Sequence, residues 1–302
     1  MSNDSELVWM KLPLEYRSAE KSSFVVLPVS YEKDVTYGKG TSNGSSSIVS
    51  ASSHLEYYDE EFDCEYFEKG VYVHPSLDLS SGSAEDMVSK VQGEVVSCGV
   101  EKFVLGLGGD HAVTIGLVRG LEEIEKQNGN EGDFAILQID AHSDFRDSWN
   151  GSVLNHACVM KQLSGRHEIV YVGIRSQDKD ERVLVDECES VQTVYAWEYS
   201  ISKVKESLLN LKAKRMYITI DVDGFDPSVI SCTGTPEPGG LFWKQVIEIL
   251  KLCFSMKEII GADIVEFLPI YESNGEESNQ SRVEAYTLAR LVSKIFSLAV
   301  KK

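Results

Sequence analysis

The stretch FAILQIDAHSD, residues 134–144, decides the fold expected for this chain and the place of its chemistry. Its first half is an apolar run of the length typical of a buried strand. From Asp140 onward every second position is acidic or imidazole, as Asp140, His142 and Asp144. Because alternate residues of an extended backbone share one face, these side chains can converge at the end of the strand. Carboxylates that close together repel one another without a cation between them, so the stretch predicts either a metal site or a turn whose Asp side chains cap backbone amides.

The rest of the chain alternates between strand-like and helix-like segments. Strands are expected at residues 23–29, 71–73, 103–107, 134–140, 169–174, 191–195, 216–222 and 259–267. Helices are expected at residues 44–58, 84–97, 113–126, 156–163, 178–188, 201–211, 242–254 and 283–300. This alternation predicts a single α/β domain over residues 1–302, with a largely parallel sheet covered by helices on both faces. A closed eight-stranded barrel is the alternative. The acidic, Ser- and Asn-rich residues 272–281 are expected to form a solvated loop.

Composition and charge restrict the function classes. The 302 residues are 42% hydrophobic and 25% charged, as in a soluble globular protein, and no apolar run reaches the ~18 residues of a membrane span. The N-terminal residues 1–6 are polar and acidic, which argues against a signal peptide. Six scattered cysteines without a Cys-x-x-Cys pair indicate reduced thiols in a cytoplasmic protein. The net charge of −19 argues against nucleic acid or an anionic membrane as partner, and it is compatible with a cationic substrate.

Two further polar clusters follow expected strands. GGDH, residues 108–111, closes one strand and opens a helix, so His111 is either a ligand or an exposed residue behind an Asp cap. In IDVDGFDP, residues 220–227, Asp221 and Asp223 share one face at the end of another strand. Asp226 precedes proline and is expected to form a turn instead. The Pro- and Gly-rich residues 233–240 are expected to form a structured loop near the site.

Together these clusters supply a ligand set at the C-terminal ends of strands, where open parallel sheets bind ligands. Its members are His111, Asp140, His142, Asp144, Asp221 and Asp223. Four carboxylates would be neutralised by two divalent cations. Carboxylate and imidazole ligands without thiolate suit manganese, with zinc, iron, cobalt or nickel as alternatives. A centre of two metal ions is helped by carboxylates that bind both ions at once. The candidates for these bridging ligands are Asp140 and Asp221, the first Asp of each motif.

The motifs GGDH, DAHSD and DVDGFDP, the last followed by TGTPEPGG, resemble the three signatures of the ureohydrolase family, the arginases and agmatinases. The similarity extends from about Val25 to the C-terminal helix. It implies a three-layer α/β/α sandwich around a mostly parallel eight-stranded sheet, a centre of two Mn²⁺ ions, and homotrimers or homohexamers. By motif position, one ion would take His111, Asp140, Asp144 and Asp221, and the other would take Asp140, His142, Asp221 and Asp223.

The reaction that the resemblance implies is hydrolysis of a guanidino group to urea and an amine. Glu266, within DIVE, matches the family glutamate that pairs with the guanidinium. His156, within LNHA, matches the family histidine that shuttles protons. Read without the resemblance, Glu266 is an ordinary glutamate at a strand end and His156 a histidine that begins a helix.

The segments around His156 and residues 235–240 look most like agmatinases of prokaryotic, particularly archaeal, type, so a small cationic guanidino substrate, agmatine, is expected. Arginases hold the substrate carboxylate with an Asn at the place of Arg146. A cation there opposes a cationic substrate unless Arg146 points away or pairs with Asp147. Guanidinobutyrate or another guanidino acid, and arginase activity, remain the alternatives. Other classes left open are a one-zinc deacetylase of related fold and a catalytically silent metal-binding protein.

Overall fold

One open sheet of parallel strands forms the centre of the computed structural model, which describes residues 7–33, 35–79, 81–130 and 134–301. Residues 1–6, the polar N-terminal segment, lie outside that part of the chain. The strands run in the order β2 (Val71–Val73), β1 (Phe24–Ser30), β4 (Phe103–Leu107), β9 (Glu258–Val265), β8 (Arg215–Asp221), β5 (Phe134–Ile139), β6 (Ile169–Val172) and β7 (Val191–Val194). The two-residue β3 (Leu77–Asp78) pairs with the end of β1. The outermost strands, β2 and β7, do not meet, so the closed-barrel alternative is wrong and the open parallel sheet is confirmed.

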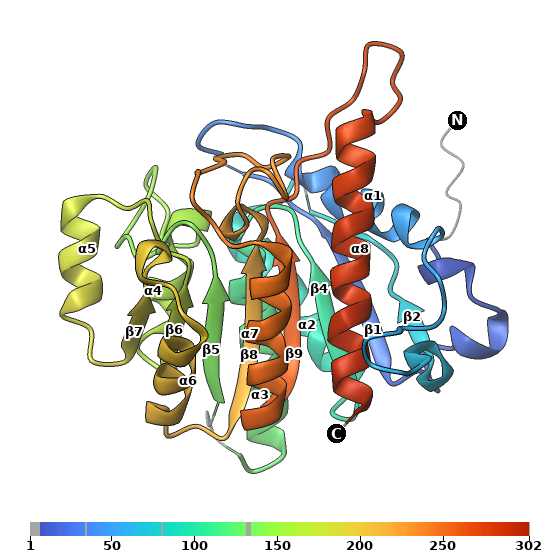
Figure 1. Cartoon of the computed structure of the whole chain (residues 1–302), viewed down its shortest axis with the longest axis horizontal. Helices are drawn as coiled ribbons and strands as arrows, with labels where there is room; N and C mark the ends of the chain where they lie inside the picture. The colour runs from blue at the N-terminus through green and yellow to red at the C-terminus, as the bar shows by residue number, and fades with distance from the viewer. Residues whose placement is uncertain (1–6, 34, 80, 131–133, 302) are drawn as a thin grey trace.

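Helices cover both faces of the sheet, which gives the three layers seen in Figure 1. One apolar core joins the sheet to α1 (Gly44–Ser52), α6 (Ile201–Asn210), α7 (Trp243–Met256) and α8 (Asn279–Val300). A second core joins the other face to α2 (Ala84–Cys98), α3 (Val113–Gln127), α4 (Val159–Leu163) and α5 (Lys179–Asp186). Short 3-10 helices span Trp9–Lys11, Leu14–Tyr16, Thr41–Asn43, Tyr66–Lys69, His156–Cys158, Ala196–Glu198 and Val222–Gly224.

The central strands are buried on both faces, which explains their continuous apolar sequences. All of β5 is buried, and so is all of β8 except its first residue. The register aligns the ends of these strands: Ile139 of β5 lies opposite Ile220 of β8, and Asp221 lies opposite Val265 of β9. The polar residues that follow the strands therefore emerge at one edge of the sheet.

Two helix boundaries differ from the expected ones by four residues or more. Helix α1 ends at Ser52, six residues before the expected end at residue 58, and Ser53 follows as its C-terminal cap residue. Helix α8 begins at Asn279, so residues 279–281 belong to its first turn and not to the expected loop. The side chain of Ser278 accepts a hydrogen bond from the amide of Ser281 at 3.2 Å, and this cap lies hidden among other polar residues of the segment.

None of the six cysteines is in a disulfide, and Cys158, Cys232 and Cys253 are buried, so the expectation of reduced thiols fits the structure. Among the described residues, none of the helices combines the length and the apolar character that a membrane crossing requires.

Candidate metal centre

Four adjacent strands in the middle of the sheet, β4, β9, β8 and β5, deliver the polar clusters to one place. His111 follows β4, Glu266 follows β9, Asp221 ends β8, and the segment 140–144 follows β5. Because all four strands are parallel, their carboxyl ends lie at the same edge of the sheet. Chain segments that are far apart in sequence thereby share one site.

A first group of ligand-type atoms surrounds the imidazole of His111, which is 0% exposed. Its Nδ1 lies 3.2 Å from Asp140 Oδ2, 2.9 Å from Asp144 Oδ2 and 3.3 Å from Asp221 Oδ2. None of these contacts has the geometry of a hydrogen bond. A buried ring nitrogen that faces three carboxylate oxygens, without a hydrogen bond to any of them, fits a divalent cation among the four groups.

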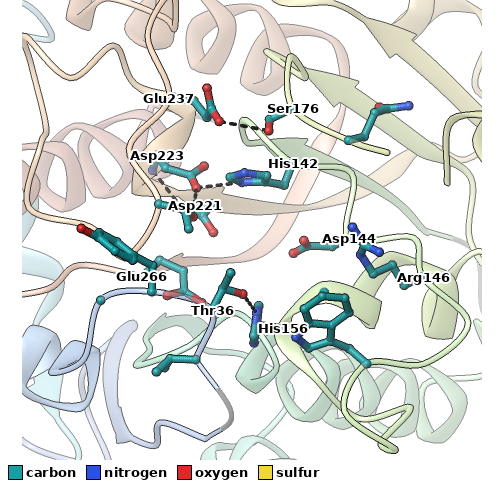
Figure 2. A pocket seen from close by; sticks show the side chains of 18 of the residues that line it. Thr36, His142, Asp144, Arg146, His156, Ser176, Asp221, Asp223, Glu237 and Glu266 are labelled. Carbon is teal, nitrogen blue, oxygen red and sulfur yellow. Dashed lines mark hydrogen bonds and ion pairs between the residues drawn. The ribbon is translucent and has the colours of Figure 1, made fainter. Parts of the chain in front are cut away.

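A second group lies beside the first and shares Asp140 with it. His142 Nδ1 is 2.9 Å from Asp223 Oδ2 and 3.8 Å from Asp140 Oδ1, as Figure 2 shows for the pair His142 and Asp223. Asp140 therefore turns one oxygen toward His111 and the other toward His142. The ligand atoms of Asp140, His142 and Asp223 lie within 4.8 Å of one another, as do those of His111, Asp140 and Asp144. The side chains present fit two adjacent cations.

The pKa values of the cluster reflect its crowded negative charge. Burial, together with the charges of Asp223 and Asp144, raises the pKa of Asp140 to about 8. Burial, together with the charges of Asp223 and Asp140, raises the pKa of Asp221 well above its ordinary value. Burial alone would lower the pKa of His142, but the charge of Asp223 outweighs it and raises the value to about 11. Carboxyl groups in such surroundings ionise at neutral pH only with positive charge next to them, which a pair of divalent cations would supply.

A hydrogen-bonded chain behind His111 fixes its orientation. His111 Nε2 lies 2.9 Å from Thr219 Oγ1, which donates to Asp263 Oδ1 at 2.6 Å. Asp263 is fully buried and also accepts hydrogen bonds from Thr114 Oγ1 at 2.8 Å and from Tyr217 OH at 2.6 Å. Because Thr219 gives its proton to Asp263, its oxygen accepts one from Nε2, which leaves the Nδ1 lone pair directed at the cluster. These hydrogen bonds were not predicted from the sequence, although the polar side chains at alternate positions 217, 219 and 221 of β8 indicate them.

Glu266 stands at the edge of the cluster in an unusual backbone conformation, with φ = 65°. Its amide donates to the carbonyl of Gly109 at 2.8 Å, and its Oε1 accepts from the amide of His111 at 2.7 Å. A side chain at Gly109 would lie 1.7 Å from the carbonyl oxygen of Tyr31, so only glycine fits there. Burial, together with the charges of Asp221 and Asp110, raises the pKa of Glu266 well above its ordinary value. This carboxylate is therefore held rigidly where a cationic ligand would stabilise its charge.

His156 lies across the site from the cluster, at the start of a 3-10 helix. Its Nε2 is 2.9 Å from Thr36 Oγ1, a contact visible in Figure 2. Thr36 belongs to a loop whose following turn is held by Glu32, which accepts from the amides of Gly40 at 2.6 Å and Ser42 at 3.3 Å. Nothing in the sequence pairs Thr36 with His156, because the two residues belong to loops that approach each other only in the fold.

These groups surround a cavity of about 430 Å³ that is open on one side. Of the expected site residues, the cavity is lined by His142, Asp144, His156, Asp221, Asp223 and Glu266. His111 and Asp140 lie beneath its floor with 0% exposure. The loop 233–240 contributes a wall, as expected from its composition, and Asp226 forms the expected turn by accepting from the amide of Ser228 at 3.0 Å.

Arg146 also lines the cavity, and it pairs with a residue other than Asp147. Its Nη1 lies 2.6 Å from Asp178 Oδ2, whereas Asp147 forms an ion pair with Lys161 at 3.3 Å. Pairing with Asp147 was one of two possibilities raised from the sequence, and it does not form, because residues adjacent on this loop point in different directions.

The comparison with known families accounts for this arrangement: residues 22–293 match the Arginase family. This chain belongs to the arginase family. It is 33% identical over 281 residues to the N(1)-aminopropylagmatine ureohydrolase of Synechocystis, with 88% of each chain covered. It is 30% identical over 280 residues to the agmatinase of Bacillus anthracis, covering 90% of this chain and 91% of that one.

Solved structures support the same assignment. A putative agmatinase from Clostridium difficile superposes with a TM-score of 0.80 at 26% identity, covering 94% of this chain and 99% of the other. The agmatine ureohydrolase of Thermoplasma volcanium gives a TM-score of 0.77 at 26% identity, covering 94% and 92%. The chain is a ureohydrolase, an enzyme that hydrolyses a guanidino group, with an arginase-like α/β fold.

Proposed function

We propose that this ureohydrolase cleaves a guanidinoalkylamine, with agmatine as the first candidate, to urea and a diamine. The observation that carries the proposal is the buried cluster of carboxylates and imidazoles beside Glu266, a carboxylate with a raised pKa on the wall of the same cavity. With agmatine and water as reactants the products are putrescine and urea, which would give the enzyme a place in polyamine synthesis.

Two Mn²⁺ ions are the proposed cofactors, and the ligand set is the one expected from the sequence. One ion would be held by His111, Asp140, Asp144 and Asp221, and the other by Asp140, His142, Asp221 and Asp223. The contacts of His111 with three carboxylates, and of His142 with Asp223, support this division. The chemistry that such a pair supplies when bound is a water molecule acidic enough to lose its proton near neutral pH.

The remaining roles fall to side chains on the walls of the cavity. Glu266 would accept hydrogen bonds from the planar guanidinium, a pairing that charge strengthens. This contact turns the guanidinium carbon toward the cluster on the cavity floor and excludes other orientations. His156, which also lines the cavity, would donate a proton to the amine that leaves, and its imidazole suits that task near neutral pH. Thr36 would hold the ring of His156 in place through the 2.9 Å contact.

N(1)-aminopropylagmatine is the second candidate substrate. The relatives from Synechocystis and from Thermus thermophilus, at 33% and 34% identity, carry its name. It shares the guanidinobutyl group of agmatine and extends the far end by a further amine. The same machinery at the cavity floor would serve both compounds, so the choice between them rests on the outer walls.

Urea release tests the proposal. The purified protein, loaded with Mn²⁺, is assayed with agmatine, N(1)-aminopropylagmatine, arginine and 4-guanidinobutyrate side by side. We expect kcat/KM to be highest for one of the two amines and at least tenfold lower for both acids. Hydrolysis of none of the four compounds would contradict the proposed activity and favour a silent binding protein.

We further propose that the chain works as one domain over residues 1–302 and assembles as a homotrimer or homohexamer. Light scattering coupled to size-exclusion chromatography gives the mass of the assembly directly. A monomer as the only species at micromolar concentration would contradict the proposed assembly.

A further inference from the structure

Arg146 is a cation on the outer wall of a cavity proposed to take a cationic substrate, and the structure shows how its charge is compensated. Its guanidinium contacts Asp178 at 2.6 Å and Glu181 Oε2 at 3.7 Å. All three residues line the cavity. One positive and two negative charges leave this wall with one negative charge in excess.

The ion pair is fixed from several sides. The other oxygen of Glu181 accepts hydrogen bonds from Ser143 Oγ at 2.7 Å and from the amide of Phe145 at 2.9 Å, so its carboxylate stays next to Arg146. The guanidinium carbon of Arg146 lies 4.6 Å from the centre of the Trp149 ring, which packs against it. Asp178 is also tied down, because its Oδ1 caps helix α5 by accepting from the amide of Glu181 at 2.8 Å.

Arg146 lies on the opposite side of the cavity from Glu266 in Figure 2. A substrate whose guanidinium meets Glu266 therefore extends its other end toward the wall of Arg146. Binding of a carboxylate there would require Arg146 to leave Asp178, at the cost of an existing charge-assisted contact. A cationic end group meets a wall that already carries excess negative charge and an aromatic ring.

We propose that the ion pair between Arg146 and Asp178 selects the end group of the substrate: it prevents Arg146 from receiving a carboxylate, and it favours an amine. This inference rests on the proposed function, because it assigns the outer wall of the same site. Arg146 and Asp178 are thus specificity-determining residues and take no part in bond breaking.

The test removes the negative charge of Asp178 but keeps a side chain at this position that can cap the N-terminus of α5. Asp178→Asn and Asp178→Ser both leave an oxygen that can cap α5, since Asn and Ser are as good at that position as Asp. Asp147→Asn is the matched control, because it removes the same charge from the loop of Arg146 at a residue that does not line the cavity. Thermal melting checks that each variant is folded.

Two readouts are taken on the manganese-loaded proteins. Calorimetry compares binding of 1,4-diaminobutane with that of 4-aminobutyrate, which differ in one end group and need no turnover. Urea release compares kcat/KM for agmatine with that for 4-guanidinobutyrate. We expect the wild type to prefer the amine in both, and both Asp178 variants to shift each ratio toward the acid by about tenfold, as expected for one charge lost near a partly exposed site. The Asp147→Asn ratios should stay within twofold of the wild type.

The inference is overturned if the wild type binds the two compounds equally or binds neither. Unchanged ratios in the Asp178 variants, or an equal shift in Asp147→Asn, overturn it as well. If the wild type prefers the diamine in calorimetry but releases no urea from any guanidino compound, the proposed function is contradicted. The inference that the wall of Arg146 and Asp178 selects an amine is then still supported.

Discussion

At the scale of single residues, the site separates charged groups buried beneath the floor from groups that line the cavity. His111 and Asp140 have 0% exposure, whereas Glu266 and His156 face the cavity. Glu266 adopts φ = 65°, a conformation that costs free energy for a residue other than glycine and asparagine. Its contacts with the backbone of Gly109 and His111 maintain this conformation. A substitution of its side chain should therefore separate substrate binding from metal binding.

Glu266→Gln keeps an oxygen that can accept from the amide of His111 but removes the charge that pairs with a guanidinium. We expect an unchanged manganese content and a kcat/KM for agmatine reduced roughly 10–100-fold, the value of a charge-assisted hydrogen bond. Glu266→Ala should lose turnover further and still retain the metal. Elemental analysis and urea release measure the two properties on the same sample. Agmatine hydrolysis at the wild-type rate in either variant would show that Glu266 does not bind the guanidinium.

Thr219→Val removes one hydroxyl from the chain between His111 and Asp263 while nearly conserving volume. His111 then loses the acceptor that holds its Nε2 proton, so we expect manganese affinity to fall roughly 10–100-fold, as in other sites whose ligand orientation is disturbed. Competition with a metal-binding dye measures this without reference to activity. Thr114→Val is the control, because the Thr114 hydroxyl also donates to Asp263, at 2.8 Å, but does not bond to the His111 ring. The backbone bond from the Thr114 amide to the His111 carbonyl is kept by valine. Equal losses in the two variants would indicate a general effect on folding and not on the orientation of His111.

At the scale of helices and loops, α8 holds the loop that forms one wall of the cavity. Glu284 of α8 is buried and accepts hydrogen bonds from the amides of Ser231 at 3.1 Å and Cys232 at 2.7 Å. Ser231 and Cys232 directly precede the loop 233–240, in which Thr235 and Glu237 line the cavity. The C-terminal helix thus positions a loop of the site that lies about 40 residues earlier in the sequence.

Glu284→Ala should therefore affect both stability and the cavity wall. Two backbone amides lose their acceptor, one of them buried, so we expect the free energy of unfolding to fall by about 2–3 kcal/mol and KM for the substrate to rise. Denaturant unfolding and steady-state kinetics measure the two effects. Glu248→Ala on α7 is the control, because Glu248 is an exposed helical glutamate. A KM unchanged from the wild type would show that the loop keeps its place without Glu284.

Strands and ligand-type residues were predictable from the sequence, whereas some helix ends and contacts between loops were not. All eight expected strands form. Central strands such as β5 are apolar and buried throughout, whereas the outer strand β7, VQTV, is mostly half-buried and was expected from its place in the alternation. The first turn of α8 and the short β3 carry no apolar pattern and were not expected. The ligand-type residues could be identified because their spacing in extended segments forces them onto one face. The partner of Arg146 could not, because Asp178 comes from a different connection and only the fold brings the two together.

At the scale of the whole molecule, the centre joins β4, β5 and β8, three of the strands on which the two cores are built. The strands that stabilise the fold therefore also bring together the three carboxylates that surround His111. The mutual repulsion of these carboxylates opposes folding. Cations bound between them would reverse that effect. The stability of the entire domain should consequently depend on its metal content.

Removal of the metal should lower the melting temperature. A ligand present at 100 times its dissociation constant stabilises the folded state by about 2.7 kcal/mol per site, which for a chain of this size corresponds to several degrees. We expect treatment with a chelator to lower the melting temperature by at least that much, and added Mn²⁺ to restore it. Asp140→Asn removes the carboxylate shared by the two groups, so it should bind no metal, hydrolyse no substrate and melt at one temperature with or without chelator. Calorimetric scans of both proteins under both conditions decide the matter: an equal response of wild type and variant to the chelator would mean that the stabilising ion binds elsewhere.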